Sequence, residues 1–186
     1  LPYALFASEE EVQLFCCQAD VKGIVYGNET FRFQGSTLNL LGTAYSAGKL
    51  QIAGGDLHIA EKIENASQIE LPNYMTDILD NMKQNTGIEE IAEYNMANVT
   101  NPTICKTTTR AWCNRVNIFA DLVSNGDISF NANVMTLGYK DPVVIASENG
   151  DITIQATNVN GNGLIYAPNG TVTINVCDFD YKGSII

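Results

Sequence analysis

Residue types that carry out chemistry are scarce in this chain, and the histidine is the first to consider. His58 is the only histidine, and it lies between Leu57 and Ile59 in a segment where apolar and polar residues alternate. Because successive side chains of a strand point to opposite faces, this alternation predicts that His58 points away from the core. A lone exposed histidine with no cysteine or serine nucleophile beside it favours no catalytic role. We therefore expect a protein that is not an enzyme, although the sequence leaves a Ser-His-Asp triad open.

The five cysteines suggest a disulfide rather than a metal site. Their spacing contains no pair of C-x-x-C knuckles, which argues against zinc. Cys105 and Cys113 enclose a short polar segment, and we predict that they form a disulfide in an oxidising compartment. The odd number leaves at least one thiol unpaired in the full set, which is Cys16, Cys17, Cys105, Cys113 and Cys177.

Acidic residues offer two further kinds of chemistry. Polysaccharide lyases and glycosidases use paired carboxylates, or calcium with a basic residue, and a β-helix is one fold that carries them. Stacked coils would bring some corner acids together, so calcium stays open as a ligand, but we favour solvated corner residues. We predict no other cofactor. The acid pairs at or near expected corners are Asp121 with Asp127, Glu148 with Asp151, and Asp178 with Asp180.

The chain is acidic and carries few charges. It has 186 residues, with 10 lysines and arginines against 21 aspartates and glutamates, which gives a formal net charge of −11. Such a surface disfavours nucleic acid as a partner, whereas divalent cations and basic surfaces stay open. No run approaches the roughly 18 apolar residues of a membrane span. We interpret the start at Leu1 as that of a processed, exported chain, so we expect an extracellular or cell-surface location.

A repeat of 19 residues in the first part of the chain predicts the elements that position these residues. Apolar residues alternate within each repeat, as Phe31 does with Phe33, which is the pattern of a strand with one buried face. Gly23 and Gly42 recur at an expected corner. The columns at this step are Phe6, Val25, Ala44 and Ile63; Val12, Phe31 and Leu50; Leu14, Phe33 and Ile52; Ala19, Leu38 and Leu57; and Val21, Leu40 and Ile59.

The second half has a looser form of the same repeat, with steps of 20 to 24 residues. We expect Asp141 and Pro142 to lie in a loop that absorbs the extra residues. Gly126, Gly150 and Gly170 each follow an asparagine, and we predict corners with positive φ angles there. The columns are Ile128, Ile152 and Val172; Phe130, Ile154 and Ile174; Met135, Val159 and Phe179; and Val123, Ile145, Ile165 and Ile185.

Between the two blocks the β pattern stops. Met75, Ile78, Leu79 and Met82 have the spacing of one helix face, with Asn73 as its N-cap, and we expect this face to pack against the rest of the protein. Thr86 and Glu89 have the spacing of a capping box, which predicts a second short helix through Ile88, Ile91 and Ala92. The insertion is a candidate cap for a solenoid end or a brace along its side.

These patterns predict an all-β solenoid, a parallel β-helix with coils of about 19 to 24 residues and a helical insertion. We expect one domain with N-terminal coils over residues 1–72, a helical and looped insertion over 73–115, and C-terminal coils over 116–186.

The coil sequences resemble a family of surface proteins. They are similar to β-helical surface proteins of Gram-positive bacteria, in the style of bactofilins and pilus-assembly-like exported proteins. The resemblance implies an exported, envelope-associated structural or adhesive module, and it carries over no catalytic residues. The long insertion and extra cysteines depart from the family pattern, which speaks against simple head-to-tail polymerisation. The carrying segments are Ala4-Leu-Phe-Ala7, Gly23-Ile-Val-Tyr-Gly-Asn28, Gly42-Thr-Ala-Tyr-Ser-Ala-Gly48 and Gly163-Leu-Ile-Tyr-Ala-Pro-Asn-Gly-Thr-Val-Thr-Ile174.

The leading hypothesis is thus a noncatalytic cell-surface structural or adhesive module, with a cell-envelope or host surface component such as a polysaccharide as its partner. A carbohydrate-active enzyme is the first alternative, and a groove with two facing carboxylates would favour it. An ice-binding surface is the second alternative, because Thr153 and Thr173 are outward at equivalent positions. Ser129 and Gln13 at neighbouring equivalents, and Arg32 and Gln51 beyond them, interrupt that array.

Overall fold

The computed structural model describes residues 3–7, 11–68, 73–84, 89–92 and 97–186, and in them the chain is a parallel β-solenoid of about eight turns with one short helix. The predicted fold class is confirmed. Every strand pair in these residues is parallel, as stacking of successive coils requires. The helix α1 spans Met75–Lys83. The strands are β1 (Tyr3–Ala7), β2 (Glu11–Lys22), β3 (Ile24–Gly27), β4 (Thr30–Ser46), β5 (Lys49–Ala53), β6 (Asp56–Ile63), β7 (Glu89–Ile91), β8 (Asn98–Val99), β9 (Thr103–Cys105), β10 (Thr109–Ile118), β11 (Leu122–Ser124), β12 (Ile128–Leu137), β13 (Val143–Ser147), β14 (Ile152–Tyr166) and β15 (Val172–Ile185).

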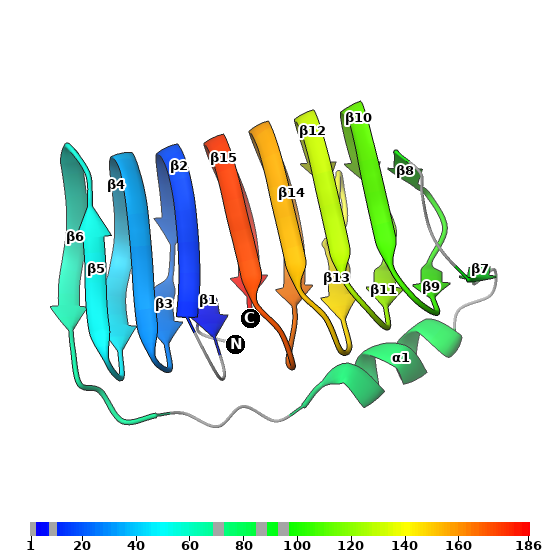
Figure 1. Ribbon diagram of the computed structural model, residues 1–186, viewed down its shortest axis with the longest axis horizontal. Helices are drawn as coiled ribbons and strands as arrows, with labels where there is room; N and C mark the ends of the chain where they lie inside the picture. Colours follow the sequence, from blue (N-terminus) through cyan, green and yellow to red (C-terminus); the bar gives the residue numbers. More distant parts are fainter. Residues whose placement is uncertain (1–2, 8–10, 69–72, 85–88, 93–96) are drawn as a thin grey trace.

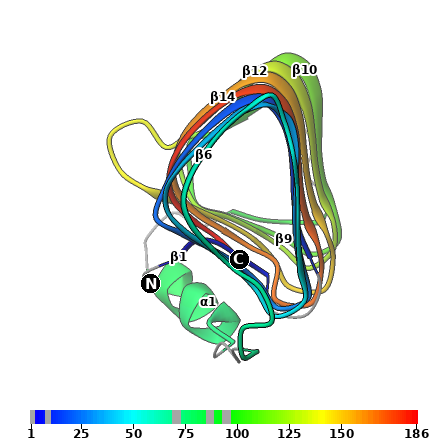
Figure 2. The ribbon, with the colours of Figure 1, turned by 90° about the vertical axis from the view of Figure 1, so that its left-hand side faces the viewer.

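Each coil has a three-sided cross-section, which Figure 2 shows along the solenoid axis. The strand β15 illustrates the three sides, because it bends twice. Its residues 172–176 belong to the first face, 178–182 to the second face and 183–185 to the third face. Equivalent residues of the other coils stack on these in register, so each face is a continuous parallel sheet.

The order of the coils along the axis does not follow the order of the chain. β15, the last strand, pairs with β14 on one side and with β2 on the other, so the two ends of the chain meet in the interior of the stack (Figure 1). We call this β2–β15 pairing the seam. From the seam the N-terminal coils run to one end of the solenoid at β5 and β6. The chain then passes along the side through α1 to β7 at the other end, and the C-terminal coils return to the seam.

The core consists of the predicted apolar columns, most of them in the predicted register. Phe31 and Phe33 are fully buried, and the column of Phe130 with Ile154 and Ile174 is as well. Burial of each such side chain contributes roughly 1.5 to 3 kcal/mol of transfer free energy, so the stacked columns supply the main stabilisation.

Three column assignments were wrong by one residue. Leu122, not Val123, pairs with Ile145. Leu5, not Phe6, pairs with Val25. The 19-residue register also slips between Leu40 and Thr43 in the β4–β6 pair, which places Lys62 rather than Ile63 beside Ala44. A slip of one residue exchanges inward and outward positions, so a fixed step misplaces residues wherever a corner gains or loses one.

The helix α1 braces the side of the solenoid rather than capping an end. Met75 and Met82 are buried against outward residues of the third face, so the predicted packing of the methionine face is confirmed. The predicted N-cap is wrong by one residue, because Tyr74 is the N-cap of α1. Asn73 precedes it, and its Oδ1 accepts a hydrogen bond from the Met75 N–H at 2.9 Å. The third face is apolar on its outer side because the helix covers it, which leaves the first and second faces free of covering elements among the described residues.

The predicted boundaries of the insertion, 73–115, are wrong at the C-terminal side. Residues 89–91 form the strand β7 and not a second helix, and β9 and β10 are already coils of the solenoid. The proposed capping residue Thr86 and the neighbouring Ile88 lie outside the described residues. The β pattern was hidden because buried positions here hold small or polar side chains, among them Thr103, Thr109 and Ala111.

The corner glycines are required by close backbone approach more than by positive φ angles. Of the five predicted corners, Gly23 has a φ of 135°, whereas the glycines of the Asn-Gly pairs do not lie in the positive region. A Cβ at Gly126 would lie 2.7 Å from the Thr107 carbonyl oxygen, and one at Gly150 would lie 2.6 Å from the Asp127 nitrogen. In the same way, Gly42 lies close to the carbonyl oxygen of Gly23, and Gly170 lies close to that of Gly150, each in the neighbouring coil. The expected loop at Asp141 and Pro142 is confirmed, because β12 ends at Leu137 and β13 begins at Val143.

Candidate functional site

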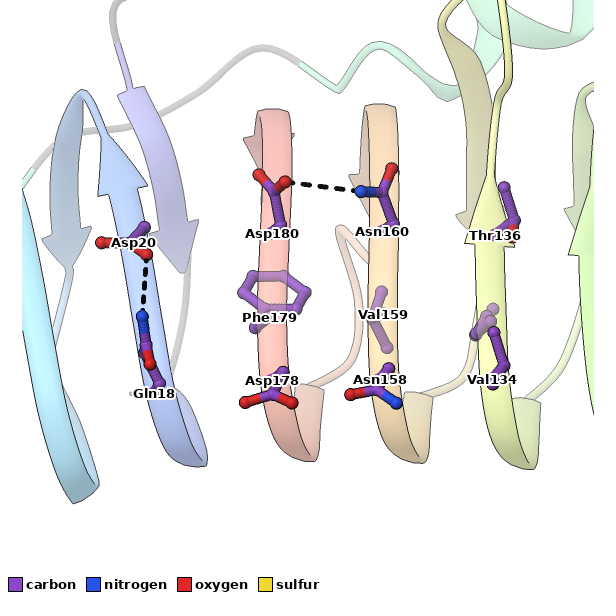
Figure 3. Close-up of a pocket in the computed structure, with 11 residues that line it drawn as sticks. Gln18, Asp20, Val134, Thr136, Asn158, Val159, Asn160, Asp178, Phe179 and Asp180 are labelled. Carbon is purple, nitrogen blue, oxygen red and sulfur yellow. Dashed lines mark hydrogen bonds between the residues drawn. The ribbon is translucent and has the colours of Figure 1, made fainter.

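A concave site lies on the second face, where it crosses the seam. Figure 3 shows its side chains on four neighbouring strands, β12, β14, β15 and β2. The cavity has a volume of about 370 Å³ and is open to solvent along the face. We call it the seam groove. Its lining residues are Gln18, Asp20, Val134, Met135, Thr136, Asn158, Val159, Asn160, Asp178, Phe179 and Asp180.

Strand alternation gives the groove two rims, which are polar except at Val134, on either side of a floor where the side chains point into the core. Phe179, Val159 and Met135 point inward and are almost fully buried, in one column of the core. The residues on either side of each floor residue point outward, so every strand contributes one side chain to each rim. On β15 these two are Asp178 and Asp180 (Figure 3).

Three carboxylates and several amides lie close together in the groove. Asp180 pairs directly with Asp20 across the seam. Amide groups donate hydrogen bonds to both: Asn160 to Asp180 at 3.4 Å, and Gln18 to Asp20 at 3.3 Å. Asn39, in the next coil, also donates to Asp20, at 2.7 Å. These bonds hold the carboxylates in place and partly offset the repulsion between two like charges in adjacent strands.

The rim that contains Asp20 and Asp180 continues along the axis far beyond the groove. Hydrogen-bonding side chains occupy each successive register position, and neighbours such as Asn117 and Asn98 are linked at 2.7 Å. Backbone groups of the ladder are already paired in the sheet, so this face presents only its side chains to a ligand. In spatial order the row is Asn98, Asn117, Thr136, Asn160, Asp180, Asp20, Asn39 and His58.

His58 stands at the end of this row, in the predicted outward position and in register with Asn39 and Asp20. Its side chain is 68% exposed, and Nε2 lies 3.0 Å from an Asp56 oxygen. No serine or cysteine is paired with His58 in the described residues, so its contacts support no triad.

The first face differs in chemistry from the second. Thr153 and Thr173 are neighbours there, as expected, and Ser129 and Gln13 flank them on either side. The sole tryptophan, Trp112, stands on the same face with 76% of its surface exposed. The interruptions in the threonine row persist in the structure, because Arg32 and Gln51 follow Gln13 along it.

The predicted disulfide between Cys105 and Cys113 is not present, because the two thiols belong to different faces. Cys105 is buried in β9 on the third face, where its thiol contacts the carbonyl oxygens of Ala92 and Thr108. Cys113 lies in β10 at the end of the first face, and its thiol contacts the carbonyl oxygen of Arg115 at 3.0 Å. Closeness in sequence did not produce closeness in space, because a coil corner separates the two.

The corner acids are engaged with backbone groups of the neighbouring coil. Asp121 accepts the Val144 N–H at 2.8 Å, Asp127 accepts the Asp151 N–H at 3.0 Å, and Asp151 accepts the Thr171 N–H at 2.8 Å. In the part of the chain that the structure describes, no three side chains of His, Cys, Asp or Glu form a group that could hold a metal ion. Within the same residues, no helix is long and apolar enough to cross a membrane.

Sequence reasoning found part of this site. Asp178 and Asp180 were singled out as a pair, and the step of 20 residues places Asn158 and Asn160 beside them. Asp20 and Gln18 were missed as groove residues, because nothing in the repeat shows that the last coil stacks on the first.

Comparisons of the chain with protein-family models, with curated proteins and with solved structures found no match.

Proposed function

We propose that this protein is a noncatalytic extracellular module for adhesion or envelope structure, and that its seam groove binds a linear polysaccharide. The observation that carries the proposal is the regular row of hydrogen-bonding side chains that runs along the axis through the groove. The exported character rests on the acidic composition and on the resemblance to β-helical surface proteins.

The shape of the site favours a polymer. Pockets for small molecules enclose most of the ligand surface, whereas this groove is shallow and its polar row continues past both ends. A ligand that repeats along its length would meet equivalent side chains at each coil. The spacing between neighbouring strands, about 4.8 Å, sets the repeat of that array.

The chemistry favours a polysaccharide over a peptide or a nucleic acid. Extended peptides bind by pairing with a free strand edge, and the groove lies on a face where the strands are already paired. Three carboxylates repel a phosphate backbone. Sugar hydroxyls both donate and accept hydrogen bonds, so they match the mixture of carboxylates and amides that lines the groove.

The proposal is tested by binding of the whole chain to insoluble cellulose, chitin, chitosan and xylan, followed by titration with the matching soluble oligosaccharide. The variant Asn158→Ala/Asn160→Ala removes two rim amides from β14. We expect it to lower the affinity by about 5- to 150-fold, because each of the two lost hydrogen bonds contributes about 0.5 to 1.5 kcal/mol.

The matched control changes the same strand on the other face. Thr153→Ala/Gln155→Ala lies on β14 in the first face and should leave binding unchanged. Trp112→Ala tests the first face directly, because an exposed tryptophan can stack on a sugar ring. Binding to none of the four polymers would overturn the proposal. Binding that is lost in Trp112→Ala and kept in the groove variant would overturn the location.

One observation favours a carbohydrate-active enzyme as the second candidate. Asp178 and Asp180 project from one strand on either side of the groove floor, which is the arrangement of two carboxylates that a glycosidase uses. Against it, both side chains are exposed, whereas the general acid of a glycosidase is shielded in an apolar pocket. Release of reducing ends from the bound polymer, abolished by Asp178→Asn or Asp180→Asn, would establish the enzyme in place of the noncatalytic module.

A further inference from the structure

Two exposed thiols from opposite ends of the chain meet at the seam. The register pairs Val176 with Cys16 and Asp178 with Gln18. Between these two pairs the corner from the first to the second face brings Cys177 of β15 against Cys17 of β2. Both are exposed, and the thiol of Cys177 hydrogen-bonds to that of Cys17, which raises the pKa of Cys177. Side chains in contact on neighbouring strands are a geometry that a covalent bond can join.

The general spacing of neighbouring strands lies within the range that a disulfide spans. Neighbouring strands of a sheet lie about 4.8 Å apart. Disulfides join cysteines whose Cα atoms are roughly 4.4 to 6.8 Å apart. The third thiol nearby, Cys16, points into the core and is 5% exposed, and burial raises its pKa to about 12. Cys16 therefore stays protonated and shielded while its two neighbours are open to reagents.

The site is accessible. A shallow cavity of about 550 Å³ lies over this corner, and Phe15, Asn175 and both exposed cysteines are among its lining residues. A small disulfide reagent or the active site of a thiol oxidoreductase can therefore reach the pair from solvent.

We propose that Cys17 and Cys177 form a disulfide across the seam when the protein meets a disulfide oxidant such as oxidised glutathione. One protein thiolate attacks a sulfur of glutathione disulfide, forms a mixed disulfide and releases one glutathione thiolate. The second protein thiol loses its proton to solvent and attacks the mixed disulfide at the protein sulfur, which releases the second glutathione. Two protein thiols are oxidised, and one glutathione disulfide is reduced to two thiols.

The disulfide would join two neighbouring coils that are far apart along the chain. The coils on each side of the seam belong to opposite ends of the chain, and strand pairing and core packing hold β2 to β15. The bond would close a loop from residue 17 to residue 177, and the stabilisation by a disulfide increases with the length of the loop that it closes. Oxidation would thus make separation of the two halves much less favourable.

The experiment treats the full reduced chain with oxidised glutathione, unfolds it in urea, blocks the remaining thiols with iodoacetamide and maps peptides without reduction. We expect a monomer with a Cys17–Cys177 link, alkylated Cys105 and Cys113, and a Tm raised by roughly 5 to 15 °C. The link and the shift should both vanish in Cys177→Ser and remain in Cys113→Ser, the matched control at another site. A bond between Cys16 and Cys17, an intermolecular bond, glutathione adducts alone, or an unchanged Tm would each overturn the proposal.

Discussion

Asp20 and Asp180 face each other in adjacent strands, although they lie near opposite ends of the chain. Their pairing places two carboxylates side by side at the seam. The side-chain amides of Gln18, Asn39 and Asn160 donate hydrogen bonds to them. Two carboxylates at directly opposed positions of a sheet destabilise it, and their repulsion is weakened by salt. The seam is therefore the part of the stack where ionic strength should matter most.

Asp180→Asn should stabilise the protein by about 0.2 to 1 kcal/mol at low salt, because it removes this repulsion. The gain should shrink at 1 M salt, where charges are screened beyond about 3 Å. Urea unfolding at both salt concentrations measures it. Asp178→Asn is the matched control, because Asp178 pairs with the neutral Gln18. An equal gain in both variants would show that the Asp20–Asp180 repulsion is not its source.

The fold should lose stability at alkaline pH because of Cys16. Burial raises the pKa of this thiol from 9.0 to about 12, so between these values the native state keeps a proton that the unfolded state has lost. Its contribution is fully present below pH 9 and is lost as the pH rises toward 12. The free energy of unfolding should fall by at most about 1.4 kcal/mol per pH unit from this group.

Urea unfolding from pH 8 to pH 11 under reducing conditions tests the contribution of Cys16. In Cys16→Ala the free energy of unfolding should fall less steeply with pH above pH 9 than in the parent. This holds whether or not the substitution changes the stability at pH 8. Burial also raises the pKa of Tyr181, so Tyr181→Phe should reduce the slope at still higher pH. Slopes that are the same in the parent and in Cys16→Ala would contradict the prediction.

Gly163→Ala should destabilise the corner between the second and third faces by about 1 to 3 kcal/mol. Gly163 has a φ of +146°, and a Cβ would lie 2.7 Å from the Val143 nitrogen. Gly55→Ala is the control, because a Cβ there would lie 3.5 Å from the nearest atom, the Ser36 oxygen. Thermal unfolding of the two variants measures the difference. Similar Tm values for both would argue against the close approach at Gly163.

Met82→Ala should release α1 from the third face. Met82 is almost fully buried at this contact, and truncation of a buried methionine costs about 2 to 5 kcal/mol. Hydrogen exchange of the α1 amides should therefore become faster, while the coil amides keep their protection. Leu79→Ala, at a half-buried position of the same helix, should have a smaller effect. Unchanged protection of α1 would mean that Met82 does not hold the helix in place.

His58→Ala should leave both fold and binding unaltered, with a change in stability within about 0.5 kcal/mol. The His58 side chain is mostly exposed, and its Nε2 contacts a carboxylate oxygen of Asp56, which is also exposed. A general base would contribute at least about 100-fold to a rate. Polysaccharide turnover by the parent chain that His58→Ala abolishes would refute the noncatalytic interpretation. Melting curves and the polymer panel used for the groove provide both readouts.

Local sequence patterns were enough to predict the structure of a single coil. The 19-residue step and the alternation of apolar residues predicted which side chains of β2, β4, β12 and β14 point inward, because strand periodicity is a local property. The outward placement of His58 and the loop at Pro142 followed in the same way. Local patterns failed where Thr103, Thr109 and Ala111 occupy buried positions, since small and polar residues do not mark a core column.

Which coils are neighbours depended on the complete fold. Every coil presents the same kind of parallel backbone edge, so the strand pattern does not say which edge meets which. The crossing through α1 carries the chain from one end of the stack to the other, and the last coil then closes on the first. That closure created the seam groove and brought Asp20 to Asp180 and Cys17 to Cys177, because residues far apart in sequence become neighbours only when the stack is complete.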